Sequence, residues 1–327
     1  MNLSFGLIGA AGYIAPKHME AIYSTGNQLV AAYDPFDSVG ILDRYFPNAD
    51  FFTEFERFDR HLDKLRRNGR GIDYLSICSP NYLHDAHIRF GLRNFAHVIC
   101  EKPVVLNPWN LDALSDLESE FRTKIFTIQQ LRSHSESVRL KEKVDNQNKK
   151  EKHQVELTYI TPRGNWYYAS WKSKMEKSGG IITNIGIHLF DLLLWVFGRE
   201  ESSELHVHTH DRAAGILNLE KAEVKWFLSI NGQTIPDSLN NTPNKAFRSL
   251  VVDDDLFDWS SEMDNLHTIS YKHILNGQGL GLEDSRPALE VSYKVREMNP
   301  TGHTKYAHSM AFLPIVPHPF EKNKFLY

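Results

Sequence analysis

Short apolar runs alternate with amphipathic stretches through the N-terminal third of the chain. The apolar runs have the pattern of strands buried on both faces, and they cover residues 3–8, 28–33, 72–78 and 97–100. The amphipathic stretches have helical spacing, and they cover about residues 16–24, 54–68, 83–93 and 108–121. Strands that alternate with helices form βαβ units, so this pattern predicts a parallel sheet covered by helices.

The second half of the chain has a different pattern, in which apolar and polar residues alternate. The alternating runs are typical of half-buried strands, and they cover about residues 153–161, 205–211, 214–219, 222–231 and 247–252. The basic stretch 141–152 precedes them, and we interpret it as an exposed helix end and connector rather than a binding patch. We therefore predict two α/β domains, over residues 1–128 and 129–296.

Residues 297–327 contain four prolines, Pro300, Pro314, Pro317 and Pro319, and are predicted to form an irregular tail. A packed arm and an altered C-terminus are both compatible with this composition.

Composition and charge narrow the class of protein. The chain has 327 residues, 41% of them hydrophobic and 24% charged, as in a globular protein of about two domains. Its net charge of −4 leaves no basic excess for binding nucleic acid or an anionic membrane. No apolar run approaches the roughly 20 residues of a membrane span, and the N-terminus lacks the positive segment of a signal peptide. We therefore expect a cytoplasmic location by elimination. Cys78 and Cys100 lie in predicted buried strands, so we expect no disulfide framework.

A glycine turn joins the first predicted strand to the first predicted helix. A helix N-terminus offers unpaired N–H groups to a pyrophosphate, and glycines let the phosphate approach. The pattern Gly9-x-x-Gly12-x-x-Ala15 departs from the usual G-x-G-x-x-G by one extra residue and a terminal alanine. The next strand ends in Asp34, about 20 residues after Gly12, where such folds place the acidic residue that binds the ribose diol. This carboxylate would repel a 2′-phosphate and favours NAD over NADP, unless Asp34-Pro35 merely opens a turn.

Polar segments follow two further strands at their carboxyl ends. Residues 79–81 have the sequence Ser-Pro-Asn, and residues 101–103 have the sequence Glu-Lys-Pro. In open α/β sheets ligands bind outside these ends, so both segments are expected near the nicotinamide end of the cofactor. The bond that precedes Pro103 is a candidate for the cis form.

These motifs together resemble the Gfo/Idh/MocA family of oxidoreductases. The likeness covers about residues 3–296, and its specific parts are residues 101–103 and the glycine-led segment 179–191. Residues 9–18, 130–132 and 161–167 look more narrowly like the subgroup that oxidises UDP-N-acetylglucosaminuronate at C3, for bacterial surface polysaccharides such as O-antigen. The resemblance implies an N-terminal Rossmann domain and a C-terminal α/β domain with a large open, mainly antiparallel sheet. It also implies a homo-oligomer, a tetramer or dimer, with 2-oxoglutarate as a candidate oxidant for the NADH.

Four residues are the candidates for catalysis. By resemblance Lys102 would contact the reacting hydroxyl, although a lysine after a strand is otherwise usually just solvated. His188 is the candidate acid/base partner, with Asp191 orienting it, and the alternative is a satisfied core histidine. The spacing places Asn184, His188 and Asp191 on one face of a single helix. Asn184 departs from the aspartate common in the wider family. Whether Lys102 or His188 accepts the proton stays open.

The other candidates are grouped by the ligand they would contact. The expected cofactor contacts are Gly9, Gly12, Tyr13, Ile14, Asp34, Ser79, Pro80, Asn81, His84, Glu101, Lys102, Gln130, Trp171 and Lys172. The expected contacts of the UDP-linked uronic acid are Lys102, Arg132, Arg163, Asn165, Asn184 and His188. This substrate is anionic, so it requires cationic side chains. Surface salt bridging is the alternative interpretation of Arg132, Arg163 and Lys172.

Other chemistries are disfavoured. His206, His208 and His210 share one face of a predicted strand, but ligands two residues apart along a strand do not readily converge on one ion, so we expect no metal site. The chain has no Gly-x-Ser-x-Gly motif of a serine hydrolase. Two alternatives stay open: elimination of a glycosidic substituent through transient oxidation at C3 by NAD, and a non-catalytic dinucleotide sensor.

Overall fold

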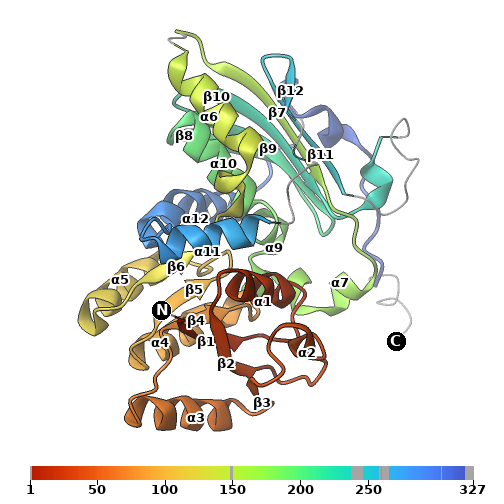
Figure 1. The fold of residues 1–327 in the computed structure, drawn as a ribbon. Helices are drawn as coiled ribbons and strands as arrows, with labels where there is room; N and C mark the ends of the chain where they lie inside the picture. The colour runs from red at the N-terminus through yellow and green to blue at the C-terminus, as the bar shows by residue number, and fades with distance from the viewer. Residues whose placement is uncertain are drawn as a thin grey trace. The chain divides into compact units, whose positions relative to one another are not determined.

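The computed structural model describes residues 2–147, 150–236, 246–257, 259, 265–302 and 304–320. The chain divides into two compact units (Figure 1): Met1–Ser133 with Asp264–Arg286, and His134–Met263 with Pro287–Tyr327. The first unit thus includes residues 264–286, which the sequence analysis assigned to the second domain. The reason is the helix α11 (Leu266–Leu275), whose Tyr271 and Ile274 are buried in the core of the first unit.

The first unit contains a six-stranded sheet in which every pair of neighbours is parallel. Its order is β3 (Asp50–Phe52), β2 (Gln28–Tyr33), β1 (Ser4–Ile8), β4 (Tyr74–Ile77), β5 (His97–Cys100) and β6 (Ile125–Thr127). The four central strands are those predicted, and most of their apolar side chains are buried. The parallel sheet is therefore confirmed, whereas the three-residue edge strands β3 and β6 escaped prediction.

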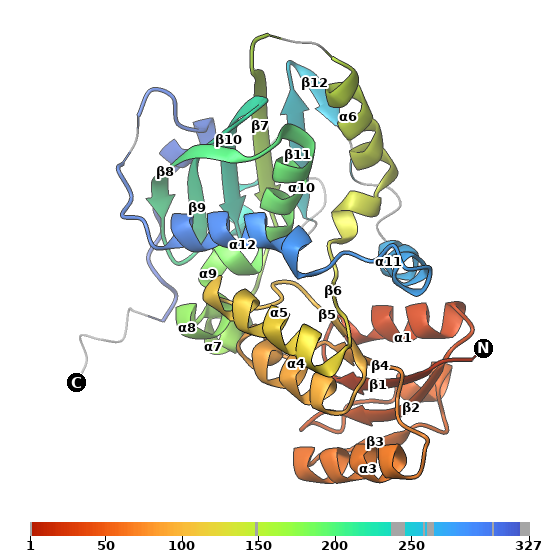
Figure 2. The same cartoon turned by 90° about the vertical axis from the view of Figure 1, so that its left-hand side faces the viewer.

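Helices of the first unit connect these strands. They are α1 (Ala15–Ser24), α2 (Leu42–Tyr45), α3 (Phe55–Arg67), α4 (His84–Arg93) and α5 (Trp109–Phe121), with the short helices η1 (Asn81–Leu83) and η2 (Gln130–Ser133). In α3 the buried residues Phe58 and Leu62 face the sheet side of an otherwise charged helix. The helices α1 and α11 lie side by side, although they are far apart in the sequence (Figure 2).

The second unit contains a mixed six-stranded sheet. Its order is β12 (Asp255–Phe257), β11 (Phe247–Val252), β7 (His153–Ile160), β10 (Ala222–Ser229), β9 (Arg212–Leu219) and β8 (Glu200–His208). Among the described strands, β7 and β10 pair in parallel and the other neighbours are antiparallel. The mainly antiparallel sheet is confirmed. The strand β8 begins earlier than predicted, and β12 was not predicted.

Helices of the second unit are mostly short. They are α6 (Ser135–Asn146), α7 (Trp166–Ala169), η3 (Trp171–Ser173), α8 (Met175–Ser178), α9 (Gly180–Asn184), α10 (Ile187–Phe197), η4 (Gly232–Thr234), α12 (Leu282–Arg296) and η6 (Ser309–Phe312). The border between the two units falls inside α12, at Pro287. Almost every side chain of α10 is buried, and Phe190 of this helix contacts Trp226 of β10 edge to face, with 5.3 Å between the ring centroids. This contact fixes α10 against the sheet of the second unit.

The described part of the predicted tail packs on the sheet of the second unit. Ala307 and Ala311 are buried in a cluster with Ile160 and Phe227. The ring of His308 stacks on Phe227 and its Nε2 lies 3.0 Å from the hydroxyl of Thr158. Around η6 the tail is therefore a packed arm. Residues 303 and 321–327 lie outside the described residues.

Cys78 and Cys100 are both free and buried in the structure. In the described part of the chain no single helix has the length and apolar character of a membrane span. The bent pair Met175–Asn184 and Ile187–Phe197 would be long and apolar enough if taken together, by length and composition alone.

Candidate cofactor and catalytic site

The glycine turn lies tightly against the carboxyl end of β4. Gly9 has φ +89°, and a Cβ at this position would lie 2.6 Å from the carbonyl carbon of Cys78. The N–H groups of Gly9 and Ala10 both donate to the carbonyl of Tyr33, at 2.8 and 3.2 Å. The turn is therefore fixed by the ends of both β2 and β4, and only glycine fits its first position.

Asp34 is held against this turn. One oxygen of its carboxylate accepts the N–H of Ala11 at 2.9 Å, and the other accepts the N–H of Phe36 at 2.9 Å. The second bond is the local bond of an Asx turn, so Asp34 does open a turn, as one interpretation of the sequence proposed. Because the first bond also ties Asp34 to the glycine turn, the two interpretations of this residue are compatible.

The segments that follow β4 and β5 are linked by His84. Its Nδ1 lies 2.7 Å from the carbonyl oxygen of Pro103, and its Nε2 lies 2.8 Å from the carbonyl oxygen of Ser79. Burial lowers the pKa of His84, and its bonds to the two carbonyls raise it only in part. The bond between Lys102 and Pro103 is cis, as predicted. His84 therefore holds residues 79 and 103 together where the strands β4 and β5 end.

The other candidates of the first unit lie in segments that follow the strands β1, β4 and β6, at the carboxyl ends of these strands. Asn81 begins η1 directly before α4 and is buried, whereas Tyr13 is almost fully exposed after the glycine turn and Ile14 packs partly on the core. Gln130 and Arg132 form η2, which follows β6 at the same edge. An Nη atom of Arg132 donates to the carbonyl of Asp284 at 2.8 Å, so this guanidinium is already engaged within the first unit.

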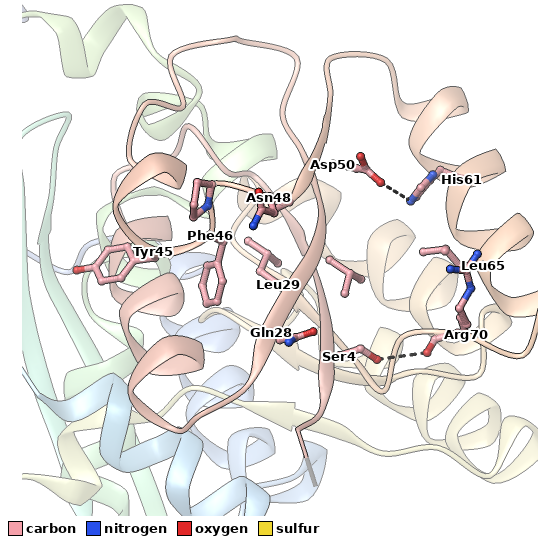
Figure 3. A pocket seen from close by; sticks show the side chains of 14 residues that line it. Ser4, Gln28, Leu29, Tyr45, Phe46, Asn48, Asp50, His61, Leu65 and Arg70 are labelled. Carbon is pink, nitrogen blue, oxygen red and sulfur yellow. Dashed lines mark hydrogen bonds and ion pairs between the residues drawn. The ribbon is translucent and has the colours of Figure 1, made fainter.

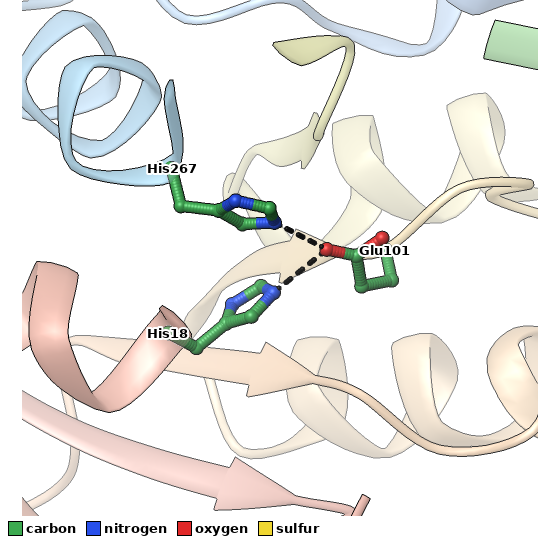
Figure 4. A group of neighbouring side chains, drawn as sticks. All are labelled: His18, Glu101 and His267. Atoms are coloured by element: carbon green, nitrogen blue, oxygen red, sulfur yellow. Dashed lines mark hydrogen bonds and ion pairs between the residues drawn. The ribbon is translucent and has the colours of Figure 1, made fainter. Parts of the chain in front are cut away.

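A buried group that the sequence analysis did not identify lies beside these residues. Nε2 of His18 and Nε2 of His267 each lie 2.9 Å from the same oxygen of Glu101 (Figure 4). His18 belongs to α1, Glu101 follows β5, and His267 belongs to α11. In the described part of the chain this is a group whose ligand atoms lie within 4.8 Å of one another, close enough to hold a metal ion. The sequence carries no local signal for it, because its members are 83 and 166 residues apart.

The candidates of the glycine-led segment occupy two helices rather than the single helix predicted. Asn184 ends α9, whereas His188 and Asp191 belong to α10, and the two segments meet at an angle of 44°. The break lies at Gly186, where a Cβ would come within 2.3 Å of the carbonyl oxygen of Ile182. The prediction of one continuous helical face was therefore wrong. His188 and Asp191 remain one turn apart on α10, and Asp191 is buried.

Aromatic side chains surround the polar candidates of the second unit. The ring of His188 contacts Tyr159 of β7 edge to face, with 5.8 Å between centroids. Burial raises the pKa of Tyr167, and the neighbouring Asn184 and Arg163 offset this only in part. Arg163 is exposed on the segment that precedes α7, as is Asn165. Lys172 lies over the ring of Trp171, 4.4 Å from its centroid.

The three histidines of the 206–210 segment do not share one face of a strand. A bulge interrupts β8 between Leu205 and Val207, and β8 ends at His208. His206 lies 3.2 Å from the carboxylate of Glu204, and the ring of His210 contacts Tyr168 and His318 instead. Each imidazole thus has a different environment.

A cavity of about 680 Å³ lies at the end of the parallel sheet where the strands begin, opposite the glycine turn (Figure 3). Residues at or near the amino ends of β1, β2 and β3 line it, among them Ser4, Gln28 and Asp50. Asp50 also pairs with His61 at 3.3 Å. Since ligands of open α/β sheets bind at the carboxyl edge, this cavity is separate from the candidate site.

Two family models match the chain, one within the N-terminal part of each unit. The model described as "Oxidoreductase family, NAD-binding Rossmann fold" matches residues 3–129, and the model described as "Oxidoreductase family, C-terminal alpha/beta domain" matches residues 141–238. A curated relative, D-glucoside 3-dehydrogenase of Escherichia coli (strain K12), is 24% identical over 64% of this chain. The match spans 58% of that relative's length.

Two solved structures resemble the chain over nearly its whole length. The WlbA (WbpB) dehydrogenase from Thermus thermophilus in complex with NAD and alpha-ketoglutarate is 44% identical, with a TM-score of 0.89 over 93% of this chain and 98% of that one. The same enzyme in complex with NAD and UDP-GlcNAcA has a TM-score of 0.88, at 44% identity over 93% of this chain and 97% of that one.

Proposed function

The chain belongs to the Gfo/Idh/MocA family of oxidoreductases, and we propose that it uses NAD to oxidise the C3 hydroxyl of UDP-N-acetylglucosaminuronate to the 3-keto sugar. The observation that carries this proposal is the likeness, at 44% identity, to a dehydrogenase solved with NAD and UDP-GlcNAcA. We further propose that 2-oxoglutarate reoxidises the NADH, because a structure of that relative holds alpha-ketoglutarate.

The residues of the glycine turn fit a dinucleotide. The turn packs tightly at Gly9 and leads directly into the N-terminus of α1, whose unpaired N–H groups a pyrophosphate would meet. The buried carboxylate of Asp34 lies against this turn, where it can accept hydrogen bonds from the ribose hydroxyls. When bound, NAD supplies the acceptor for the hydride that leaves the carbinol carbon.

The chain's own residues then have to remove a proton and hold an anionic sugar. We propose that Lys102 contacts the C3 hydroxyl, and that either its Nζ or a ring nitrogen of His188 takes the hydroxyl proton. Asp191, one helical turn from His188, would orient the imidazole. Arg163 is exposed and can place its guanidinium on the uronate carboxylate, with Asn165, Asn184 and Arg132 as further polar contacts.

We also propose which residues contact the cofactor and in which cellular process the enzyme acts. By the resemblance, the nicotinamide end would meet residues 79–81, His84 and residues 101–103, and the phosphates would meet Tyr13 and Ile14. Gln130, Trp171 and Lys172 are further proposed contacts of the cofactor. By the resemblance of the sequence, the product would serve the synthesis of surface polysaccharide in the cytoplasm, with the enzyme acting as a tetramer or dimer.

A coupled assay tests the activity. With NAD, UDP-N-acetylglucosaminuronate and 2-oxoglutarate, we expect mass spectrometry to show a nucleotide sugar lighter by two hydrogens, together with an equal amount of 2-hydroxyglutarate. UDP-N-acetylglucosamine, which lacks the carboxylate, is the matched substrate and should react at least about tenfold more slowly. If the uronate gave no keto product, or gave free sugar without oxidation, the proposal would be wrong.

Replacement of Asp34 by asparagine should weaken the preference for NAD over NADP. The substitution keeps the volume of the side chain and removes the negative charge that would repel a 2′-phosphate. We expect the ratio of kcat/KM for the two cofactors to fall roughly tenfold or more, mainly through a lower KM for NADP. Glu54→Gln, at an exposed carboxylate of the same unit, is the control. An unchanged ratio would show that Asp34 serves only the turn.

A further inference from the structure

A chain of hydrogen bonds lies beneath the Glu101–Lys102 segment and connects four elements of the first unit. The hydroxyl of Ser76 lies 2.7 Å from that of Tyr271, which lies 2.8 Å from Nδ1 of His18. The other ring nitrogen of His18 contacts Glu101, and the same carboxylate oxygen also receives Nε2 of His267 (Figure 4). All five side chains are buried. Helix α11, although it follows the second sheet in the sequence, supplies two of them, Tyr271 and His267.

Burial and charge determine the direction of these bonds. Burial alone would raise the pKa of the Glu101 carboxyl, but the bonds from His18 and His267 outweigh it and hold the pKa well below its usual value. Glu101 is thus a carboxylate that can only accept. Burial lowers the pKa of the His18 imidazole, and Glu101 raises it only in part, so this ring is neutral.

A neutral His18 has one N–H group, and Glu101 requires it at Nε2. Nδ1 must therefore accept, and its donor is the hydroxyl of Tyr271, since burial raises the pKa of this phenol well above its usual value. The oxygen of Tyr271 can in turn accept the hydroxyl proton of Ser76. The protons along the chain then have one consistent arrangement, which ends at one oxygen of Glu101.

The other oxygen of Glu101 faces the residue that the proposed reaction needs. This Oε2 accepts the backbone N–H of Lys102 at 3.2 Å. Two imidazole donors on Oε1 prevent the carboxylate from rotating away from that N–H. We propose that Glu101, oriented by His18 and His267, is a positioning residue that fixes the Lys102 backbone and so aims its side chain at the reacting hydroxyl. This inference rests on the proposed function, because it assigns the cluster a role in that reaction.

A metal ion is the competing explanation for two imidazoles and a carboxylate. Both nitrogen-to-oxygen distances of 2.9 Å are those of ordinary hydrogen bonds, and the bonds to Tyr271 and Ser76 complete the same pattern without an ion. The two explanations differ in the protonation of His18: hydrogen bonding requires a proton on Nε2, whereas metal ligation requires its absence.

Two replacements of His267 test the positioning role. His267→Phe removes a donor from Glu101, and we expect kcat to fall roughly tenfold or more while the Kd for NAD stays within about twofold. His267→Gln keeps an N–H donor and should restore most of the lost kcat. His153→Phe is the control, because it removes a buried histidine that pairs with a carboxylate, Asp253, in the second unit, and its kcat should stay within about twofold of the wild type.

Nitrogen NMR of the histidine rings gives a measurement that does not depend on activity. We expect His18 in the wild type to be neutral, with its proton on Nε2, and we expect the purified protein to contain no stoichiometric metal. A ring protonated on both nitrogens, or a bound metal that EDTA removes, would overturn the inference. So would equal loss of kcat in both His267 variants. A wild type that fails to oxidise the sugar would instead overturn the proposed function, and the NMR result would still decide the structure of the cluster.

Discussion

Replacement of Lys102 by methionine should lower kcat for sugar oxidation by about 100- to 10,000-fold, the usual effect of removing a group that transfers a proton. Lys102 follows β5 at the carboxyl edge of the parallel sheet, and its backbone N–H is held by Glu101. Its side chain is only partly exposed. Methionine preserves the length and apolar stem of the side chain, so NAD binding, measured by fluorescence titration, should change by less than about threefold.

A second replacement at the same position separates two roles of this lysine. Arginine keeps the positive charge but does not give up its proton near neutral pH. If Lys102 accepts the hydroxyl proton, Lys102→Arg should be as slow as Lys102→Met, and His188→Gln should be less damaging. If Lys102 supplies only charge, Lys102→Arg should recover much of the activity and His188→Gln should show the larger loss.

The control for both variants is Lys124→Met, which alters an exposed lysine of the same unit. It should leave kcat unchanged. An active Lys102→Met enzyme would remove Lys102 from the reaction, whatever the result for His188.

The sequence predicted those parts of the fold whose pattern is repeated over several residues. The strands β1, β2, β4 and β5 are largely buried, so each appears in the sequence as a short, mainly apolar run. The edge strands β3 and β6 have three residues each, too few to show a period. Their existence depends on pairing with β2 and β5, which only the folded chain provides.

The errors at longer range have the same physical origin. The spacing of Asn184, His188 and Asp191 suggested one helix, but the chain bends at Gly186, where a Cβ would collide with Ile182 and Leu228. The contact with Leu228 is tertiary, and the sequence shows only a glycine. In the same way, α11 has no local feature that assigns it to the first unit, which it joins through the buried Tyr271.

The residues of the candidate site also differ in how far the sequence could predict them. Motifs with fixed local spacing, such as the glycine turn and residues 101–103, could be recognised because their chemistry is local. His18 and His267 could not be assigned a role, since each acquires one only by meeting Glu101 from a distant part of the chain. Polar groups that converge across the fold in this way are invisible to any rule based on spacing.

Replacement of Gly9 by alanine should both destabilise the first unit and abolish tight NAD binding. At φ +89° an alanine is strained by about 1–3 kcal/mol. Its Cβ would also lie 2.6 Å from the carbonyl carbon of Cys78 and 2.7 Å from the backbone nitrogen of Ser79. These are backbone atoms at the end of β4, which cannot swing aside as a flexible side chain could, so overpacking adds about 1–3 kcal/mol. We expect the Tm for unfolding of the first unit to fall by roughly 5 °C or more.

Gly26→Ala separates the two contributions, because Gly26 has a similar φ of +75° but no atom within 4 Å of its ideal Cβ. This variant carries the backbone strain without the collision. It should therefore lose less stability than Gly9→Ala and should bind NAD normally, as measured by titration and by calorimetry. Equal losses in the two variants would mean that the turn tolerates a Cβ beside Cys78. The close contact between the turn and β4 would then not be what keeps the glycine turn in the shape that NAD needs.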